Sequence, residues 1–270
     1  MLMKLKILSW NVRGINELDK RLRIKGLIRD WKVDLVCLME TKMEVITSEV
    51  VRSLWGCHHV NWCYMGASGA SGGILIMWDR RVVEKVDDCV GRYTLAVSLR
   101  NVNDNFLWAF GGVYGPNDDG ERRVLWNEMA GLMSWWDRPW CFGGDFNVVR
   151  FPSERSGVGG FSAAMEDFSE FIHGQSLVDI PLQGGQFTWS NNQVWSKIDR
   201  FLLSPEWEEH YPDVSQSRLP RLLSDHFPLM LDCGAQREGK GYFKFENMWL
   251  KSDGFVDLVQ RWWESYDFHG

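Results

Sequence analysis

The sequence predicts an α+β protein in which two β-sheets pack against each other and helices lie outside them. Short apolar segments bounded by Gly, Asn and Asp turns are numerous, and they clearly outnumber the amphipathic helical segments. Strand and helix do not alternate regularly, which argues against a doubly wound parallel sheet. The chain has 270 residues, 45% hydrophobic and 24% charged, which is ordinary for a soluble globular protein and excludes disordered, collagen-like and disulfide-scaffold classes.

In the first half of the chain, residues 5–12 are interpreted as a buried strand and residues 19–32 as an amphipathic helix. A short apolar run over 34–40 ends on a carboxylate. Residues 56–78 carry no Asp, Glu, Lys or Arg and are long enough to span a membrane, but their histidines and Gly/Ser cluster favour a strand, a loop and a second strand. Three more strands follow over 82–86, 94–99 and 106–114.

The second half continues the same pattern up to about residue 235. Helices are expected over 121–135 and 163–173, and strands over 140–146, 177–180, 187–190, 198–203 and 227–231. Residues 236–241 are polar and glycine-rich, and a helix is expected over 253–265. We therefore predict a domain over 1–235 and a C-terminal appendage over 236–270, which is too short for a core of its own.

The net charge limits the possible functions of the protein, and its cysteines indicate the cellular compartment. The formal net charge of −6 excludes a generally cationic nucleic-acid coat. Residues 1–32, however, hold nine Lys/Arg against three Asp/Glu, which makes them either a solvated helix face or an edge that faces phosphates. No secretory signal or membrane segment is recognised, so the six cysteines are expected to be free thiols in a protein that is not secreted. The cluster Cys57-His58-His59 with Cys63 fits no common zinc pattern.

Polar residues recur where apolar strands end. Each alone has a plain explanation as a turn or capping residue, but together they supply carboxylates, amides, a phenol and an imidazole. Such groups bind a hard divalent cation and hydrolyse a phosphate ester. The set consists of Asn11, Glu40, Tyr114, Asp145, Asn147, Asp199, Asp225 and His226.

Six segments in order resemble the motifs of the endonuclease/exonuclease/phosphatase superfamily, the fold of exonuclease III, apurinic endonucleases and deoxyribonuclease I. They are Ser9-Trp-Asn11-Val-Arg-Gly14, Leu38-Met-Glu40-Thr-Lys42, Gly112-Val-Tyr114-Gly-Pro-Asn117, Gly143-Gly-Asp145-Phe-Asn147, Ser196-Lys-Ile-Asp199-Arg-Phe-Leu-Leu-Ser204 and Leu223-Ser-Asp225-His226-Phe-Pro228. No single motif is specific, but the ordered set is. The resemblance implies a four-layer α/β/β/α sandwich with two mostly antiparallel sheets.

The subgroup that the sequence resembles most is the endonuclease domain of plant LINE-type retrotransposons. Phe187-Thr-Trp-Ser-Asn191, Ile198-Asp-Arg-Phe-Leu202 and Phe245-Glu-Asn-Met-Trp-Leu250 carry this resemblance. In such elements a reverse transcriptase follows the nuclease, and this chain has no aromatic-x-Asp-Asp motif. The appendage is then the remnant of that connection, and the chain is a truncated element, a gene-model fragment or a domesticated copy. A nuclear location follows for a working retrotransposon nuclease, and a cytoplasmic or unknown one otherwise.

The resemblance also implies a role for each residue. Glu40 is the main ligand of Mg²⁺ or Mn²⁺, with Asn11 nearby and Asp225 assisting the metal or the histidine. Asp145 orients or deprotonates the attacking water with help from Asn147, and Asp199 fixes the tautomer of His226. His226 contacts the scissile phosphate, and Tyr114 donates to one of its oxygens. Whether Asp145 or His226 is the general base stays open.

DNA is the expected partner, with no membrane, no partner protein and a monomeric chain. Thr188 and Ser224 are candidates for secondary phosphate contacts, and Arg150, Arg155, Arg218 and Arg221 for backbone phosphates. Trp189 and Trp195 either pack against a sugar or flipped base or belong to the core.

Two other functions compete with DNA nicking that leaves a 3′-hydroxyl. A phosphomonoesterase such as an inositol polyphosphate 5-phosphatase carries a Pro-x-Trp pattern where this chain reads Trp195-Ser-Lys-Ile-Asp199. A catalytically silent fragment or binding module is the other alternative. Retention of all eight strand-end residues weighs against it.

Overall fold

The computed structural model describes residues 5–69, 72–157, 159–234 and, near the C-terminus, residues 254, 255, 257, 258, 260 and 261. The chain divides into two compact units, Met1–Ala235 and Gln236–Gly270. Within the second unit, the described residues 255, 257, 258, 260 and 261 are helical, and the rest of the helix expected over 253–265 lies outside the described residues. The role of this unit as the remnant of a lost connection stays a prediction.

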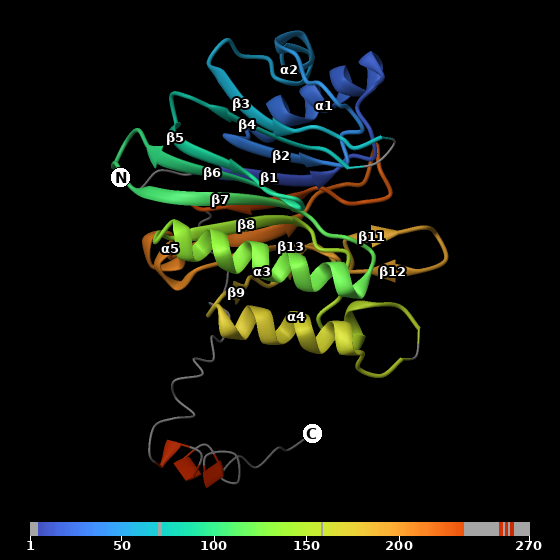
Figure 1. The fold of residues 1–270 in the computed structure, drawn as a ribbon, viewed down its shortest axis with the longest axis vertical. Coiled ribbons are helices and arrows are strands. Elements are labelled where there is room, and N and C mark those ends of the chain that lie inside the picture. The colour runs from blue at the N-terminus through green and yellow to red at the C-terminus, as the bar shows by residue number, and fades with distance from the viewer. Residues whose placement is uncertain are drawn as a thin grey trace, which may run out of the picture. The chain divides into compact units, whose positions relative to one another are not determined.

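The first unit is built on two large sheets (Figure 1). The first sheet has seven strands in the order β10 (Leu182–Gln183), β14 (Ser215–Arg218), β15 (Leu229–Asp232), β1 (Lys6–Asn11), β2 (Leu35–Met39), β4 (Ile74–Asp79) and β3 (Val60–Met65). The second has six, in the order β5 (Val83–Val90), β6 (Thr94–Asn101), β7 (Leu107–Tyr114), β8 (Trp140–Asp145), β13 (Asp199–Leu203) and β9 (Val178–Asp179). Strands β11 (Trp189–Ser190) and β12 (Trp195–Ser196) form a separate hairpin.

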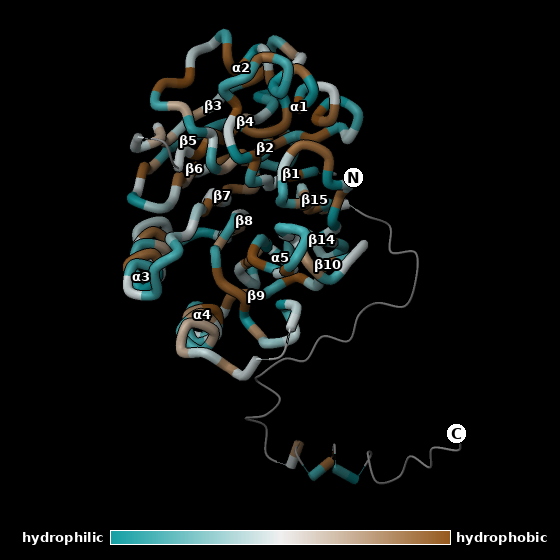
Figure 2. The backbone as a smooth tube through the Cα atoms, turned by 90° about the vertical axis from the view of Figure 1, so that its right-hand side faces the viewer, coloured by the Kyte–Doolittle hydropathy of each residue, from teal (hydrophilic) through white to brown (hydrophobic). Residues whose placement is uncertain are grey.

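Helices cover the outer face of each sheet. Helices α1 (Leu18–Trp31) and α2 (Ser48–Leu54) lie over the first sheet, and α3 (Asp119–Trp135) and α4 (Ala163–Gly174) over the second, as Figures 1 and 2 show. A short helix α5 (Pro205–His210) and a 3₁₀ turn (Pro152–Glu154) complete the described elements. The expected four-layer α/β/β/α sandwich is confirmed. None of the helices in the described part of the chain is both long and apolar enough to cross a membrane.

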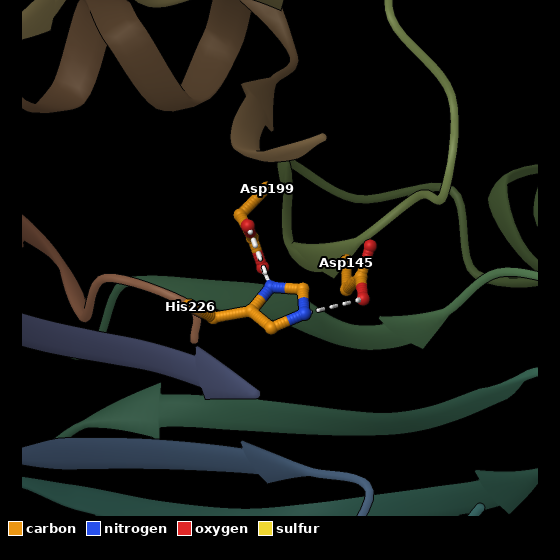
Figure 3. Close-up of side chains that lie close together, drawn as sticks. All are labelled: Asp145, Asp199 and His226. Atoms are coloured by element: carbon orange, nitrogen blue, oxygen red, sulfur yellow. Dashed lines mark hydrogen bonds and ion pairs between the residues drawn. The ribbon is translucent and has the colours of Figure 1, made fainter. Parts of the chain in front are cut away.

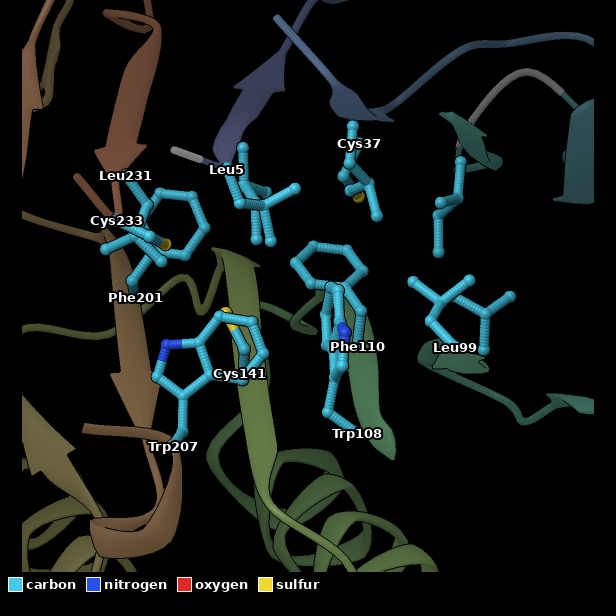
Figure 4. Close-up of a cluster of buried hydrophobic side chains, with 14 of the residues drawn as sticks. Leu5, Cys37, Leu99, Trp108, Phe110, Cys141, Phe201, Trp207, Leu231 and Cys233 are labelled. Carbon is cyan, nitrogen blue, oxygen red and sulfur yellow. The ribbon is translucent and has the colours of Figure 1, made fainter. Parts of the chain in front are cut away.

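Three buried apolar clusters fill the three interfaces between these four layers. The central cluster joins the facing sides of the two sheets, with Leu5, Cys37, Phe110, Cys141 and Phe201 among its side chains (Figure 4). Separate clusters bind α1 and α2 to the first sheet and α3 and α4 to the second. The six cysteines are free thiols, as expected.

The two sheets approach each other closely near the ends of β2 and β7. A Cβ atom added to Gly112 would lie 2.6 Å from the sulfur of Cys37, so only glycine allows this approach. The parallel pairs β1–β2 and β7–β8 end at this same region. Because strands paired in parallel carry their carboxyl ends to one edge, residues 11, 40, 114 and 145 are brought together there.

Candidate active site at the carboxyl ends of the central strands

One cavity of about 340 Å³ collects most of the polar residues that end the strands. Predicted residues that line it are Asn11, Glu40, Tyr114, Asp145, Asn147, Trp189 and His226. Asn11 Nδ2 donates to Oδ2 of Asp145 at 2.9 Å, which connects the end of β1 in one sheet to the end of β8 in the other. The cavity therefore spans both sheets, and its polar walls come from distant parts of the sequence.

Asp145, Asp199 and His226 form a buried cluster beside this cavity (Figure 3). Nδ1 of His226 lies 3.0 Å from Oδ2 and 3.1 Å from Oδ1 of Asp199, and its Nε2 lies 3.7 Å from Oδ2 of Asp145. Burial alone would lower the pKa of His226, but the charge and hydrogen bond of Asp199 and the charges of Asp145 and Asp225 raise it to about 9. The two carboxylates therefore favour the protonated form of the imidazole.

The pKa of Asp145 is raised to about 7, first by burial and then by the negative charge of Asp199. The charge of His226 and hydrogen bonds from Asn11 and the Asn147 N–H oppose this rise. The Asn147 N–H donates to Oδ1 of Asp145 at 2.9 Å, and Asn147 takes a left-handed backbone conformation (φ 51°). Asp145 can therefore exchange a proton near neutral pH.

Glu40 follows β2 and is held between two cations. Lys42 Nζ lies 3.1 Å and Arg13 Nε 3.8 Å from the same oxygen, Oε1 of Glu40. All three residues have left-handed backbone conformations, with φ between 49° and 57°. Non-glycine residues adopt this conformation at a cost, which is most common at functional sites.

The donors around this cavity fit a divalent cation of the Mg²⁺ type. Glu40 offers a nearly buried carboxylate, and Asn11 and Asn147 offer amide groups nearby; hard cations take such oxygen ligands. By distance alone, Asp145, Asp199 and His226 could also hold a metal, since one ligand atom of each lies within 4.8 Å of the others. Both ring nitrogens of His226 already face carboxylates, however: Nδ1 lies 3.0 Å from Asp199 and Nε2 lies 3.7 Å from Asp145. We therefore assign the cation to Glu40 and proton transfer to the Asp/Asp/His cluster as a prediction.

Tyr114 ends β7 on the wall of the cavity. Burial, followed by the negative charges of Glu40 and Asp145, raises the pKa of its phenol to about 12. The phenol consequently keeps its proton and can donate a hydrogen bond to an anionic substrate.

Asp225 lies at the rim and faces a neighbouring pocket of about 640 Å³, lined also by Arg13, Lys20 and Arg23. Arg13 and the indole N–H of Trp189 both donate to its Oδ2, the latter at 2.9 Å. Burial would raise the pKa of Asp225, but hydrogen bonds and the charges of His226 and Arg13 lower it. Asp225 thus holds neighbouring side chains in place, and its assignment as a metal ligand gains no support from these contacts.

Thr188 and Ser224 do not line the catalytic cavity. The buried Thr188 hydroxyl accepts the backbone N–H groups of Ile198 and Asp199. Ser224 Oγ donates to the carbonyl of Asn11 at 2.8 Å and accepts the N–H of His226 at 3.2 Å. Both hydroxyls therefore bond to the backbone. Ser224 also lines the neighbouring pocket beside Arg13 and Asp225, and contact of either hydroxyl with phosphate stays a prediction.

The four arginines proposed as phosphate contacts differ in how free their side chains are to reach DNA. Arg155 is exposed, whereas Arg150 lies 3.5 Å from Asp179 and stacks on Phe151. Arg218 and Arg221 donate to carbonyls of residues 184, 187 and 190 and stack on Phe227. These last two are parts of the wall that supports the β11–β12 hairpin. Trp195 is half-buried in the same wall, in contact with Phe187 and Phe227.

Sequence reasoning missed Ser196 and Ile198, which line the cavity from within a quoted motif. It also missed three residues in loops at the site: Arg13, Lys42 and Asn117. Each stood inside a quoted motif, two residues after Asn11, two after Glu40 and three after Tyr114. The sequence could have indicated Arg13, Lys42 and Asn117 as site residues, because each lies in a loop beside a predicted amide, carboxylate or phenol.

The chain is similar to several known proteins. The model of the Endonuclease/Exonuclease/phosphatase family matches residues 8–226. An exodeoxyribonuclease of Bacillus subtilis (strain 168) is 26% identical over 263 residues, covering 84% of this chain and 98% of that protein. Among solved structures, a 3′ phosphatase from Neisseria bound to a product DNA hairpin has a TM-score of 0.66 at 15% identity and covers 84% of this chain and 98% of its own.

The endonuclease domain of TRAS1, a telomere-specific non-LTR retrotransposon, has a TM-score of 0.64 at 14% identity and covers 85% of this chain and 98% of its own. At such identities the structural likenesses show the fold alone. The family match covers most of the chain and ends on His226. The chain therefore belongs to the Endonuclease/Exonuclease/phosphatase family of metal-dependent nucleases and phosphodiesterases.

Proposed function

We propose that this protein is a divalent-metal-dependent endonuclease that nicks duplex DNA and leaves a 3′-hydroxyl. The observation that carries the proposal is the convergence of Glu40, Asp145 and His226 on one cavity of about 340 Å³. That cavity combines a hard-cation ligand, a carboxylate that can take up a proton and a cationic hydrogen-bond donor. These are the groups needed to cleave a phosphodiester by attack of water.

The roles follow from the protonation states. Asp145 accepts the proton of the attacking water, because its pKa of about 7 leaves much of it ionised at neutral pH. Asn11 and the Asn147 N–H hold its two oxygens in place. His226 is already protonated and donates through Nε2 to the phosphate, while Asp199 fixes the ring through Nδ1. We thus favour Asp145 over His226 as the general base.

The phosphate is held from the other side by Tyr114 and Arg13, which line the same cavity. A divalent cation bound at Glu40 would offset the charge that develops on the phosphate and the leaving oxygen. The new bond joins the water oxygen to phosphorus, and the bond from phosphorus to the 3′ oxygen breaks. That oxygen takes up a proton and becomes the 3′-hydroxyl, and the phosphate stays on the 5′ end.

DNA as the substrate class is supported by the names of the similar proteins, an exodeoxyribonuclease and a 3′ phosphatase bound to a DNA hairpin. The finer proposal, target-site nicking as in LINE-type retrotransposons, draws on the motif over 187–191 and on a fold shared with the TRAS1 endonuclease domain. A protein with this role would act in the nucleus.

Nicking of closed supercoiled plasmid by the purified full chain tests the proposal, since a closed circle offers no ends to an exonuclease or a 3′ phosphatase. We expect relaxed circles with Mg²⁺ or Mn²⁺, none with excess EDTA, and nicks that a DNA polymerase extends without prior end repair. The exposed His173 provides a matched control, and His173→Ala should nick at the parental rate. Cleavage of linear DNA ends or of inositol phosphates, with closed circles left intact, would refute the endonuclease assignment.

A further inference from the structure

One buried threonine is hydrogen-bonded to both chain segments that carry the Asp199–His226 pair. The Thr188 hydroxyl accepts the backbone N–H of Asp199 at 3.0 Å and that of Ile198 at 3.1 Å. The Thr188 carbonyl accepts the N–H of Phe227, the residue after His226, at 2.7 Å. The side chain of Thr188 therefore fixes one partner of the pair, and its main chain fixes the other.

The sheet itself leaves this end of β13 without a strand partner on one side. Strand β8 pairs with β13 from Asp199 to Leu203, but on the opposite side β9 pairs only with Leu202 and Leu203. The N–H groups of Ile198 and Asp199 thus need an acceptor that no strand supplies, since buried N–H groups in native proteins are nearly always paired. The Thr188 hydroxyl fills this place.

We propose that Thr188 is a positioning residue that sets the geometry of the Asp199–His226 hydrogen bond. It is fully buried and does not line the catalytic cavity, so it acts through Asp199 and not on the substrate. The proposal rests on the proposed function for its kinetic consequence, but its structural consequence is independent of any substrate.

Two substitutions of Thr188 separate the effect of its hydroxyl from the effect of its side-chain shape. Thr188→Val keeps the shape and removes the acceptor, so Asp199 loses its anchor and the imidazole loses its fixed partner. Thr188→Ser keeps the hydroxyl and removes only a methyl group. Because misplacement by about 1 Å costs on the order of a hundredfold in rate, we expect Thr188→Val to lower kcat by roughly tenfold to a hundredfold with little change in KM.

A matched control is Thr94→Val. Thr94 is also fully buried, and its hydroxyl also makes a hydrogen bond, to Oε1 of Glu128 at 2.5 Å, but it lies at the start of β6 outside the cavity. This variant should lose stability by a similar mechanism while keeping kcat near that of the parent.

The deciding measurement is the NMR signal of the Nδ1 proton of His226 in ¹⁵N-labelled full-length protein. We expect a downfield signal in the parent, in Thr188→Ser and in Thr94→Val, and a shifted or exchange-broadened signal in Thr188→Val. An unchanged signal in Thr188→Val would overturn the proposal, as would loss of the signal in Thr188→Ser. If Thr188→Val does not fold, Thr188→Ala, which also removes the hydroxyl, takes its place with the same expected and contrary results. If no variant cleaves DNA, the proton signal still tests the positioning role.

Discussion

Asp199 and Asp145 are direct partners across the antiparallel strands β13 and β8, and the imidazole of His226 contacts both carboxylates. Two acidic groups at paired positions repel each other unless a proton or a cation lies between them. His226, which enters from the loop before β15, supplies that cation. The sheet register therefore creates the need for a charged imidazole, and it adds the repulsion of Asp199 to the burial that raises the pKa of Asp145.

The pH dependence of nicking follows from these two pKa values. The rate should rise through about pH 7 as Asp145 ionises and becomes able to accept a proton. It should fall through about pH 9 as His226 loses the proton that it donates to phosphate. Asp199→Asn removes the charge that stabilises the imidazolium, so the alkaline limb should move to lower pH. A rate that is flat between pH 6 and 10 would contradict both assignments.

Glu40 should control metal affinity more than proton transfer. Glu40→Gln keeps the size of the side chain but removes its charge, so the Mg²⁺ concentration for half-maximal rate should rise about tenfold or more, and high Mg²⁺ should recover part of the rate. The exposed Glu49 on α2 is the matched control, and Glu49→Gln should leave the Mg²⁺ titration unchanged. Identical titrations for Glu40→Gln and the parent would place the metal elsewhere.

The basic side chains of helix α1 have two roles. Some hold the fold together, and others are free to contact DNA phosphates. Arg21 donates to the carbonyls of Ile15 and Asn16 and to Ser53, so Arg21→Gln should mainly lower stability. Arg23 is exposed and lines the pocket beside the catalytic cavity. Arg23→Gln should reduce the slope of log affinity against log salt by about one unit, as expected for one lost phosphate contact. Unchanged salt dependence would make this face of the helix merely solvated.

How far the sequence predicts this structure depends on the kind of signal. The long apolar strands and the strand-end residues were recognisable, because a buried strand reads as a continuous apolar run and a polar residue interrupts it visibly. Helices α2 and α5 and strand β14 were not predicted. Each is short, and β14 reads Ser-Gln-Ser-Arg, whose pairing with β15 comes from the tertiary structure and not from any periodicity.

Within the site, the chemistry was predictable but the supporting hydrogen bonds were not. Thr188 and Ser224 were expected at phosphate, yet their hydroxyls are bound to the backbone. A hydroxyl in a sequence can contact a ligand or a neighbouring N–H, and only the relative placement of distant segments decides between the two. The same holds for Arg13, whose partner Asp225 lies 212 residues away.

Asp34 gives a stability prediction that is independent of function. Burial raises the pKa of its carboxyl to about 6, and the hydrogen bond from the N–H of Lys6 only partly opposes this. The folded state therefore holds the proton more tightly than the unfolded chain, so the free energy of unfolding should fall as pH rises from about 4 to 6. Asp34→Asn should remove this loss and stabilise the protein by about 1 kcal/mol at pH 7, after allowance for solvent screening. Denaturant unfolding of the parent and of Asp34→Asn at pH 4 and pH 7 measures this difference in stability. An equal effect of the substitution at both pH values would contradict the raised pKa of Asp34 as its cause.

The most direct test of the account is the rate at which His226→Ala nicks supercoiled DNA across a Mg²⁺ titration. We expect a loss on the order of a hundredfold to ten-thousandfold that no Mg²⁺ concentration recovers, because a positioned proton donor is gone and the metal ligands remain. DNA binding should survive, since most of the affinity comes from other phosphate contacts. Nicking by His226→Ala at near the parental rate, or full recovery at high Mg²⁺, would show that the Asp145–Asp199–His226 cluster is not the catalytic site.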